Sequence, residues 1–334
     1  MEKDNEIILS VKDLKTYIYV NNRCNRAVDG VSFNVHKGKT LGIVGESGCG
    51  KSITASSIMQ LLPKLSRIES GEIVYHKDDE AIRIDLLERN GKPMRDLRGA
   101  DISMIFQDPM TALNPVYTIG SQIKENLLYH TSMDKKSMMN KTIEMLEKMG
   151  IPLPHQRAEE YPHQFSGGMR QRAMIAMAMS CNPKILIADE PTTALDVTIQ
   201  AQIFELIDEL KQRYNTAVIL ITHDMGVVAE LADHVAVMYM GNIVEQGTVD
   251  DVLRRPAHPY TEALLKSIPI LGKGKQQQIT PIQGSTPDPY QRPKGCQFRP
   301  RCPYATEQCQ AFPSSQPISA VSYTHLTLPT KRIV

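Results

Sequence analysis

The sequence predicts an α/β fold in which helices cover a mostly parallel sheet. Short apolar runs alternate along the chain with stretches that repeat apolar residues at helical spacing. Three of these runs are apolar almost throughout: Ile102–Gln107, Lys184–Asp189 and Ala217–Thr222. Strands without a polar face belong in the centre of a parallel sheet that is covered on both sides. A chain of 334 residues with 41% apolar residues is long enough to bury such a core.

The remaining predicted elements follow in the order expected of this fold class. Two further strands are expected at Ile7–Val11 and Thr40–Gly45. Apolar residues at helical spacing predict helices at Asp134–Met149 and Val197–Tyr214. Helices are also expected at Lys51–Leu62, directly after a glycine turn, and at Met169–Ser180, which is rich in Met and Ala. The segment from about 119 to 178 contains no predicted strand, so we interpret it as a helical subdomain inserted in the main fold. Prolines become frequent after about residue 255, and we expect the regular core to end there.

Composition and charge exclude several classes of protein. The net charge is +1, which gives no reason to expect nucleic acid as a partner. The N-terminus is charged and lacks the apolar core of a signal peptide. The sequence contains no run of about 18 apolar residues, the length that a membrane-spanning helix needs. We therefore expect a chain that stays in the cytoplasm, where thiols are kept reduced.

A glycine-rich stretch, GESGCGKS, has the spacing G-x-x-x-x-G-K-[ST] and lies between a predicted strand and a predicted helix. Glycines let the backbone N–H groups surround phosphates, and the positive end of the following helix adds to the attraction. The lysine would reach the β- and γ-phosphates and the serine would ligate Mg²⁺. The candidate ATP-binding residues are Gly45, Glu46, Ser47, Gly48, Cys49, Gly50, Lys51 and Ser52.

Two acidic residues end the apolar run ILIADE. Asp189 is expected at the carboxyl end of its strand, where ligands bind in open α/β sheets, and it would hold Mg²⁺. Glu190 projects differently and would polarise the attacking water as a general base. Beside a phosphate loop, this pair predicts hydrolysis of a nucleotide rather than a solvated strand end.

A second candidate anion site lies in QFSGGMRQR. Ser166, Gly167 and Gly168 form a turn of small residues at the start of a predicted helix, and Met169 follows as a further candidate residue of this site. Because the chain already has its own phosphate loop, a second such site suggests that the nucleotide lies between two copies.

These motifs, together with IFQDP, TTALD and ITHD, resemble in order and spacing those of an ABC-transporter ATP-binding subunit, over about residues 6 to 272. The resemblance implies the P-loop NTPase fold of the ABC cassette. That fold has a RecA-like, mostly parallel core, an antiparallel β part near the N-terminus and an inserted helical subdomain. It also implies ATP and Mg²⁺ as ligands.

The resemblance assigns roles to further residues. Gln107 is similar to the glutamine that senses the γ-phosphate through Mg²⁺ and links to the helical subdomain. Ser166–Met169 resemble the signature that binds the ATP of the other protomer, and Asp196 resembles the residue that crosses the dimer interface. His223 resembles the histidine that contacts the γ-phosphate.

An aromatic residue after the first strand usually stacks on adenine in this family. Ile18 aligns there, between Tyr17 and Tyr19. Tyr19 is our candidate, with the alternative that both tyrosines are ordinary strand residues.

The C-terminal stretches RRPAHPYTEALLKSIP and GSTPDPYQRPKGCQFRPRCPYA resemble the extension of oligopeptide and dipeptide importer ATPases, including nickel importers. The expected function is ATP hydrolysis that powers peptide import, as a D-type cassette at the cytoplasmic face of a bacterial or archaeal membrane. Its partners would be a second ABC ATPase subunit, two transmembrane permease subunits and an extracytoplasmic solute-binding protein. One alternative is a nickel or other small-solute importer. Another is a soluble ABC ATPase that remodels nucleic acid or protein, although no sustained heptads separate Lys51 from Ser166.

Three cysteines, Cys296, Cys302 and Cys309, cluster in the extension. Clustered thiols in a reducing compartment indicate metal before disulfide, and the family resemblance implies a [4Fe–4S] cluster with a fourth cysteine further on. No fourth cysteine follows here, so the ligand set is incomplete. The alternatives are a purely structural site or cysteines in an ordinary loop.

The last residues, Val321–Val334, read like the translation of a transposase-type sequencing adapter. We therefore expect three regions: an ABC ATP-binding domain over 1–255, an extension over 256–320 and a non-native tail over 321–334. The natural gene is expected to continue and to supply the fourth cysteine.

Overall fold

The computed structural model describes residues 6–78, 80–193, 195–267, 281–311, 315–319 and 322–325. The chain divides into two compact units, each built from three stretches of sequence. Unit 1 comprises Met1–Ile8, Val35–Thr40 and Leu86–Ile221, and unit 2 comprises Leu9–Asn34, Leu41–Asp85 and Thr222–Val334. The expected domain boundary at residue 255 stays a prediction.

Unit 1 contains a buried parallel sheet. Its strands β6 (Ile102–Ile105), β7 (Ile185–Asp189) and β8 (Ala217–Thr222) lie in the order β8-β7-β6. Every residue of β7 and β8 is buried. The prediction of buried parallel strands from their uniformly apolar sequences is therefore confirmed, but β6 lies at the edge of the sheet rather than in its centre.

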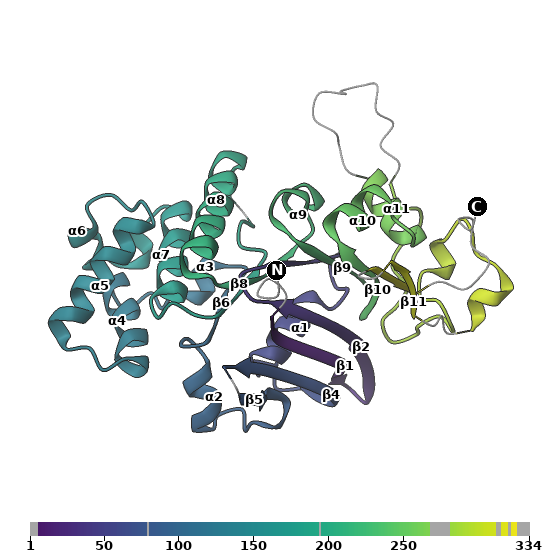
Figure 1. Ribbon diagram of the computed structural model, residues 1–334, viewed down its shortest axis with the longest axis horizontal. Coiled ribbons are helices and arrows are strands. Elements are labelled where there is room, and N and C mark those ends of the chain that lie inside the picture. The colour runs from purple at the N-terminus through teal and green to yellow at the C-terminus, as the bar shows by residue number, and fades with distance from the viewer. Residues whose placement is uncertain are drawn as a thin grey trace. The chain divides into compact units, whose positions relative to one another are not determined.

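Most helices of unit 1 follow β6 or β7 in the chain, and α2 precedes β6. A group of helices lies together at one side of this unit (Figure 1): α4 (Ile119–His130), α5 (Lys135–Lys148), α6 (Pro154–Ala158) and α7 (Gly167–Met179). The described residues between 119 and 179 contain no strand, as expected. The other helices are α2 (Lys92–Leu97), α3 (Pro109–Ala112) and α8 (Val197–Tyr214). Side chains cap several of these helices, among them Asp134 at α5, whose carboxylate accepts from two backbone N–H groups.

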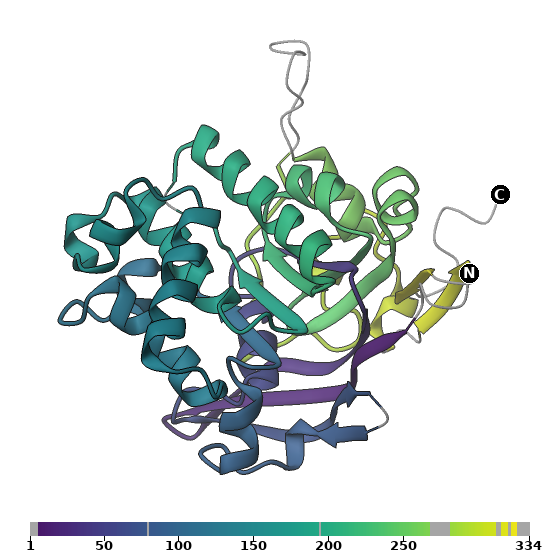
Figure 2. The same cartoon turned by 60° about the vertical axis from the view of Figure 1, so that its left-hand side comes forward.

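Unit 2 contains an antiparallel sheet with the order β2-β1-β4-β5, whose purple and blue strands can be followed in Figure 2. Its strands are β1 (Ile7–Val20), β2 (Arg23–His36), β4 (Ser66–Lys77) and β5 (Glu80–Arg83). The register of β1 on β4 places Leu9 opposite Tyr75 and Ile18 opposite Ser66. This is the antiparallel part that the family resemblance implied.

A second sheet of unit 2 carries the phosphate loop. In it, β3 (Thr40–Val44) runs parallel to β9 (His234–Tyr239), and β9 pairs antiparallel with β10 (Asn242–Thr248). The helices of this unit are α1 (Lys51–Ile58), α9 (Met225–Leu231), α10 (Val249–Arg254) and α11 (Pro259–Lys266). No helix in the described part of the chain is both long and apolar enough to cross a bilayer.

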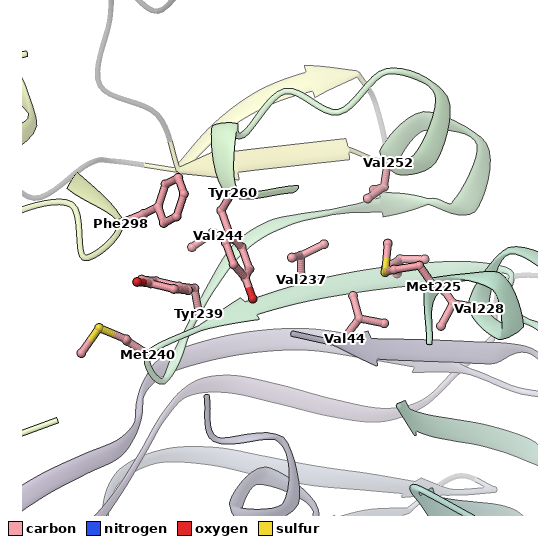
Figure 3. Packing of buried hydrophobic residues seen from close by; sticks show 11 residues of the cluster. Val44, Met225, Val228, Val237, Tyr239, Met240, Val244, Val252, Tyr260 and Phe298 are labelled. Atoms are coloured by element: carbon pink, nitrogen blue, oxygen red, sulfur yellow. The ribbon is translucent and has the colours of Figure 1, made fainter. Parts of the chain in front are cut away.

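The expectation that the regular core ends at about residue 255 was wrong. Helix α11 begins with Pro259, which costs little in the first turn because its missing N–H would have no partner there. Tyr260 on this helix is 0% exposed and packs with Tyr239 and Phe298 (Figure 3). The proline-rich segment thus adds to the core of unit 2.

Two short strands follow the cysteine segment. They are β11 (Ser315–Ser319) and β12 (Ser322–His325), and β12 pairs with both β11 and β10. Four residues of the expected tail are thus part of a sheet, and the other residues of 321–334 lie outside the described residues. That this tail is non-native stays a prediction.

Candidate functional site

The phosphate loop of unit 2 has a backbone that only glycine fits at two positions. Gly45 has a φ of 151°, and a Cβ there would lie 2.2 Å from Met238 O. Gly50 has a φ of 108°, and a Cβ there would lie 2.2 Å from Ala27 O. The loop therefore turns tightly against its own unit before α1 begins at Lys51.

Lys51 is the basic group of this loop. Its side chain is buried, and Nζ donates to Gly45 O at 2.8 Å and to Glu46 O at 3.2 Å. Ser52 is exposed at the second residue of the helix, as are Ser47 and Gly48 at the tip of the loop. A lysine, a helix N-terminus and glycine backbone in one turn are the donor set that a polyphosphate requires.

Cys49 lies inside the loop and is buried. Burial raises the pKa of its thiol, which keeps it protonated. Its N–H donates to Glu46 O at 3.3 Å. Cys49 is therefore a packing residue of the loop rather than a nucleophile.

In unit 1 the acid pair lies at the carboxyl end of β7. Asp189 is the last residue of the strand and is 5% exposed. Glu190 has a φ of 45°, a conformation that is costly for a residue with a side chain, and its N–H is fixed by Ile221 O at 2.9 Å. Its carboxylate accepts from Gln107 Nε2 at 2.9 Å and from Thr193 Oγ1 at 3.2 Å. The structure thus brings together two residues that the sequence assigned to one reaction.

Unit 1 also carries the signature residues. Ser166 caps α7 by accepting from the N–H of Met169 at 3.3 Å, and Gly167 begins the helix. A Cβ on Gly168 would lie 3.1 Å from a methyl group of Ile199, so a glycine allows close packing there. Ser166 and Gly167 are exposed, which leaves this helix start accessible to an anion.

Asp196 and His223 each lie at a helix start. Asp196 Oδ1 caps α8 by accepting from the N–H of Ile199 at 3.0 Å. His223 of unit 2 is exposed and precedes Asp224, whose Oδ1 caps α9 by accepting from Gly226 N at 2.8 Å. Asp196 therefore has a structural duty besides its expected role at an interface.

The candidate adenine residues point to separate polar groups of unit 2. Tyr17 OH donates to Asp29 Oδ1 at 2.9 Å, and burial together with this bond raises the pKa of Tyr17 to about 12. Tyr19 OH donates to Glu69, and the Arg67 guanidinium lies 4.7 Å from the ring centroid. One face of the Tyr19 ring is thus covered by a cation.

The three cysteines of the extension do not form the expected cluster site. Within the described residues, no group of three or more His, Cys, Asp or Glu is placed to hold a metal ion. Burial raises the pKa of Cys296 and of Cys302, which opposes the thiolate that iron requires. The Thr306 N–H donates to Cys309 Sγ at 3.5 Å. The arrangement does not fit a [4Fe–4S] cluster, and that expectation is not supported.

Two residues that contact the phosphate loop escaped the sequence analysis. The N–H of Glu46 donates to Tyr260 OH at 2.9 Å, and the Arg301 guanidinium binds the Glu46 carboxylate. The sequence feature that could have indicated such a partner is the Glu46 carboxylate, because a negative charge within an anion-binding loop needs a compensating cation.

A glycine-rich loop between a buried strand and a helix, with an acid pair at the end of another buried strand, defines a nucleotide-hydrolysing P-loop protein. Comparisons with known proteins narrow this class. The family profile described as "ABC transporter" matches residues 28–193, and the profile "Oligopeptide/dipeptide transporter, C-terminal region" matches residues 244–309.

Curated relatives match over nearly the whole chain. The dipeptide transport ATP-binding protein DppD of Bacillus subtilis is 52% identical over 96% of this chain and 93% of its own. The DppD protein of Escherichia coli is 47% identical over 91% of each chain. The oligopeptide transport ATP-binding protein OppD of Bacillus subtilis is 48% identical over 95% of this chain and 87% of its own.

Solved structures have the same fold. The ATP-binding cassette MJ0796, in a dimeric post-hydrolysis state with ADP and Pi, is 25% identical with a TM-score of 0.63 over 72% of this chain and 98% of its own. The cassette cbiO1 of Clostridium perfringens is 25% identical with a TM-score of 0.61 over 75% of this chain and 92% of its own. The chain belongs to the ABC transporter family and is an ATP-binding subunit of it.

Proposed function

We propose that this chain is the ATP-hydrolysing subunit of an importer for dipeptides or oligopeptides. The observation that carries the substrate class is the C-terminal match over residues 244–309, together with relatives named for dipeptide and oligopeptide transport. The hydrolysing activity follows from the family. A nickel or other small-solute importer is the alternative within the same family.

The residues around the phosphate loop bind and orient ATP in this proposal. Backbone N–H groups of Gly45–Ser52 surround the β- and γ-phosphates, and the buried ammonium of Lys51 supplies the positive charge. The Ser52 hydroxyl, the Asp189 carboxylate and the Gln107 amide oxygen would be the oxygen donors for Mg²⁺, which prefers such ligands. Bound Mg²⁺ would neutralise charge on the phosphate oxygens.

Glu190 is the general base. It accepts the proton of the attacking water, while Gln107 and Thr193 hold the carboxylate in place. His223 contacts the γ-phosphate. The exposed helix start at Ser166–Met169 binds the ATP of a second ATPase subunit, whose interface Asp196 joins.

The partners in this proposal are a second ABC ATPase subunit, two transmembrane permease subunits and an extracytoplasmic solute-binding protein. Large apolar side chains just after Gln107 support docking to the permeases: Met110, Val116 and Tyr117 are 59%, 71% and 56% exposed. Exposed apolar side chains that gather in one place favour an interaction surface, and these three lie within one segment of eight residues. They lie three to ten positions after Gln107, so in this proposal movement at the nucleotide would reach the membrane subunits through this segment. The chain thus acts as a peripheral protein at the cytoplasmic face of the membrane.

The test is a crosslinked pull-down of the tagged chain from its native membranes, with every captured protein identified. Two permeases, a second ATPase and a peptide-binding protein support the proposal. A capture containing nucleic acid or soluble proteins only, without permeases, contradicts the transport function. Val116→Glu should reduce capture of the permeases, because a carboxylate replaces an apolar contact. Leu86→Glu is the matched control, since Leu86 is equally exposed at 72% but lies outside this surface.

A further inference from the structure

Glu46, the second residue of the phosphate loop, is held at two points by residues from the C-terminal part of the chain. Its backbone N–H donates to Tyr260 OH at 2.9 Å. Its carboxylate accepts hydrogen bonds from both terminal nitrogens of Arg301: Nη1 donates to Oε2 at 2.6 Å and Nη2 donates to Oε1 at 3.0 Å. Two parallel bonds of this kind fix the direction of the carboxylate as well as its distance.

The Arg301 guanidinium is removed from water. Its side chain is 4% exposed, against 29% for Glu46. Nε donates to Gln283 O at 3.1 Å and Nη1 also reaches Tyr239 OH at 3.4 Å. The bond to Glu46 raises the pKa of Arg301, so the cation is permanent. A buried charge of this kind is costly unless it is paired, which makes Glu46 its required partner.

The segment that presents Arg301 is anchored to the core of unit 2. The Arg301 N–H donates to Phe298 O at 2.9 Å, and the Arg299 N–H donates to Cys296 O at 3.1 Å. Phe298 packs its ring 5.3 Å from both Tyr239 and Tyr260 (Figure 3). Tyr260 is therefore linked to the phosphate loop by its hydroxyl and to the segment that carries Arg301 by the contact of its ring with Phe298.

The three cysteines surround the same turn. Cys302 follows Arg301 directly, and the Cys296 N–H donates to Cys309 O at 2.9 Å, which closes the segment on itself. The cysteine segment thus holds Arg301 in place. Among the described residues, the Arg301 guanidinium is the one that binds the phosphate loop.

We propose that Arg301 is a positioning residue for ATP binding, which acts through Glu46 to set the conformation and the charge of the phosphate loop. Without Arg301, the Glu46 carboxylate would be an uncompensated negative charge within the loop that binds the phosphates of ATP, and it would repel them. The C-terminal extension thereby controls the affinity of the loop for ATP. This inference rests on the proposed function, because it requires that the loop binds ATP.

The experiment is equilibrium binding of a non-hydrolysable ATP analogue with Mg²⁺ to the full chain. Arg301→Ala should raise the Kd by about 10-fold, a coupling typical of residues in direct contact. Arg301→Lys, which keeps the charge but loses the bidentate geometry, should recover part of that loss. Arg299→Ala, on the same turn, is the control and should leave the Kd unchanged, since its side chain makes no hydrogen bond to the loop in the described structure.

A double variant separates action through Glu46 from general damage. In a Glu46→Ala background, Arg301→Ala should change the Kd by less than about twofold, because its partner is already absent. In the wild-type background, Arg301→Ala should raise the KM for ATP and leave kcat within about twofold of the wild-type value, since Glu190 is unchanged. Thermal unfolding of each variant shows whether it is folded, and Arg301→Lys carries the test if the alanine variant is not.

The outcomes distinguish the inference from the function on which it rests. If the wild-type chain binds the analogue no better than Lys51→Ala, the assigned ATP site is wrong. If the wild type binds and Arg301→Ala binds equally well, the ATP site stands and the positioning role of Arg301 is overturned. An equal loss with and without Glu46 also overturns it.

Discussion

Gln107 Nε2 donates a hydrogen bond of 2.9 Å to Glu190 Oε2, although the two residues lie 83 positions apart in the chain. Gln107 follows β6 and Glu190 follows the adjacent parallel strand β7. Neighbouring parallel strands end at the same edge of their sheet, so this pairing is a consequence of topology. The bond ties the residue that leads into the helical subdomain to the candidate general base.

We expect Gln107→Ala to lower kcat for ATP hydrolysis by about 10-fold, within the range for a misplaced general base. The variant keeps the second bond to Glu190, from Thr193 Oγ1 at 3.2 Å. Steady-state ATPase assays and analogue binding would separate kcat from affinity. Thr193→Val is the matched variant that removes the other hydrogen-bond donor to Glu190, and it should also lower kcat. Full activity in both variants would contradict a role for these bonds.

Glu190→Gln should retain ATP binding while hydrolysis falls by about 10² or more, because the amide cannot accept the proton of the attacking water. The substitution preserves size and the ability to accept from Gln107. Single-turnover hydrolysis at saturating ATP is the measurement. Glu205→Gln, at an exposed position of α8, controls for the loss of a carboxylate in the same unit. Normal turnover of Glu190→Gln would remove Glu190 as the base.

Lys51→Ala should weaken ATP binding by at least about 10-fold, since a cation facing the phosphates is lost. The buried ammonium is also bonded to Gly45 O and Glu46 O, so the thermal midpoint should be recorded beside the Kd. Lys64→Ala, at an exposed position of the same unit, is the control for removal of a positive charge. An unchanged Kd in Lys51→Ala would contradict phosphate binding by this loop.

The local patterns of the sequence predicted the central strands and their polar ends well. Strands β7 and β8 were predictable because a run that is buried on both faces is apolar except at its end. The phosphate loop was predictable because its glycine spacing reflects backbone that other residues cannot adopt, as at Gly45 and Gly50.

Contacts between distant residues were not predictable in this way. Arg301 and Glu46 are 255 positions apart, and nothing in the spacing of either residue indicates the other. Helix α11 was not predictable from its prolines, because clustered prolines usually end regular structure, whereas Pro259 occupies the first turn of the helix, where proline is accepted. The cysteine spacing suggested a metal site, but Cys296 and Cys302 pack against the apolar cluster of unit 2, and no metal-binding group forms among the described residues.

Glu245 gives a pH-dependent prediction. It is 1% exposed and accepts from Ala257 N at 2.8 Å and His258 N at 3.0 Å, and burial raises its pKa above the ordinary value of 4.5. The folded chain then binds this proton more tightly than the unfolded chain does. The stability from this group is fully present below pH 4.5 and is lost as the pH rises through the raised pKa.

Acidification from pH 7 towards pH 5 should therefore stabilise the wild type relative to Glu245→Gln, in which this group does not titrate. Denaturant unfolding of both chains across this range is the measurement, and the difference between them cancels the titration of other groups. Glu205→Gln serves again as an exposed control. A difference that does not change with pH would show that Glu245 has no raised pKa in the folded chain.

Ser166 caps α7 and also lies at the helix start that is expected to bind an anion, and one substitution can separate these two roles. Ser166→Asp keeps the cap, because aspartate accepts from the same N–H groups as well as serine does, but it adds a negative charge. The free energy of unfolding of Ser166→Asp should differ from that of the wild type by less than about 0.5 kcal/mol, whereas Ser166→Ala should lower it by about 1 kcal/mol.

ATP hydrolysis at saturating Mg-ATP should fall by about 10-fold or more in Ser166→Asp, because the added carboxylate repels the phosphates of the ATP that a second subunit brings to this helix start. Thr118→Asp makes the same kind of change at the cap of α4 and should leave hydrolysis unchanged. If Ser166→Asp hydrolyses ATP at the wild-type rate, the exposed start of α7 is only a structural cap. If Thr118→Asp is equally inactive, the loss reflects damage to the helical subdomain rather than repulsion at the signature.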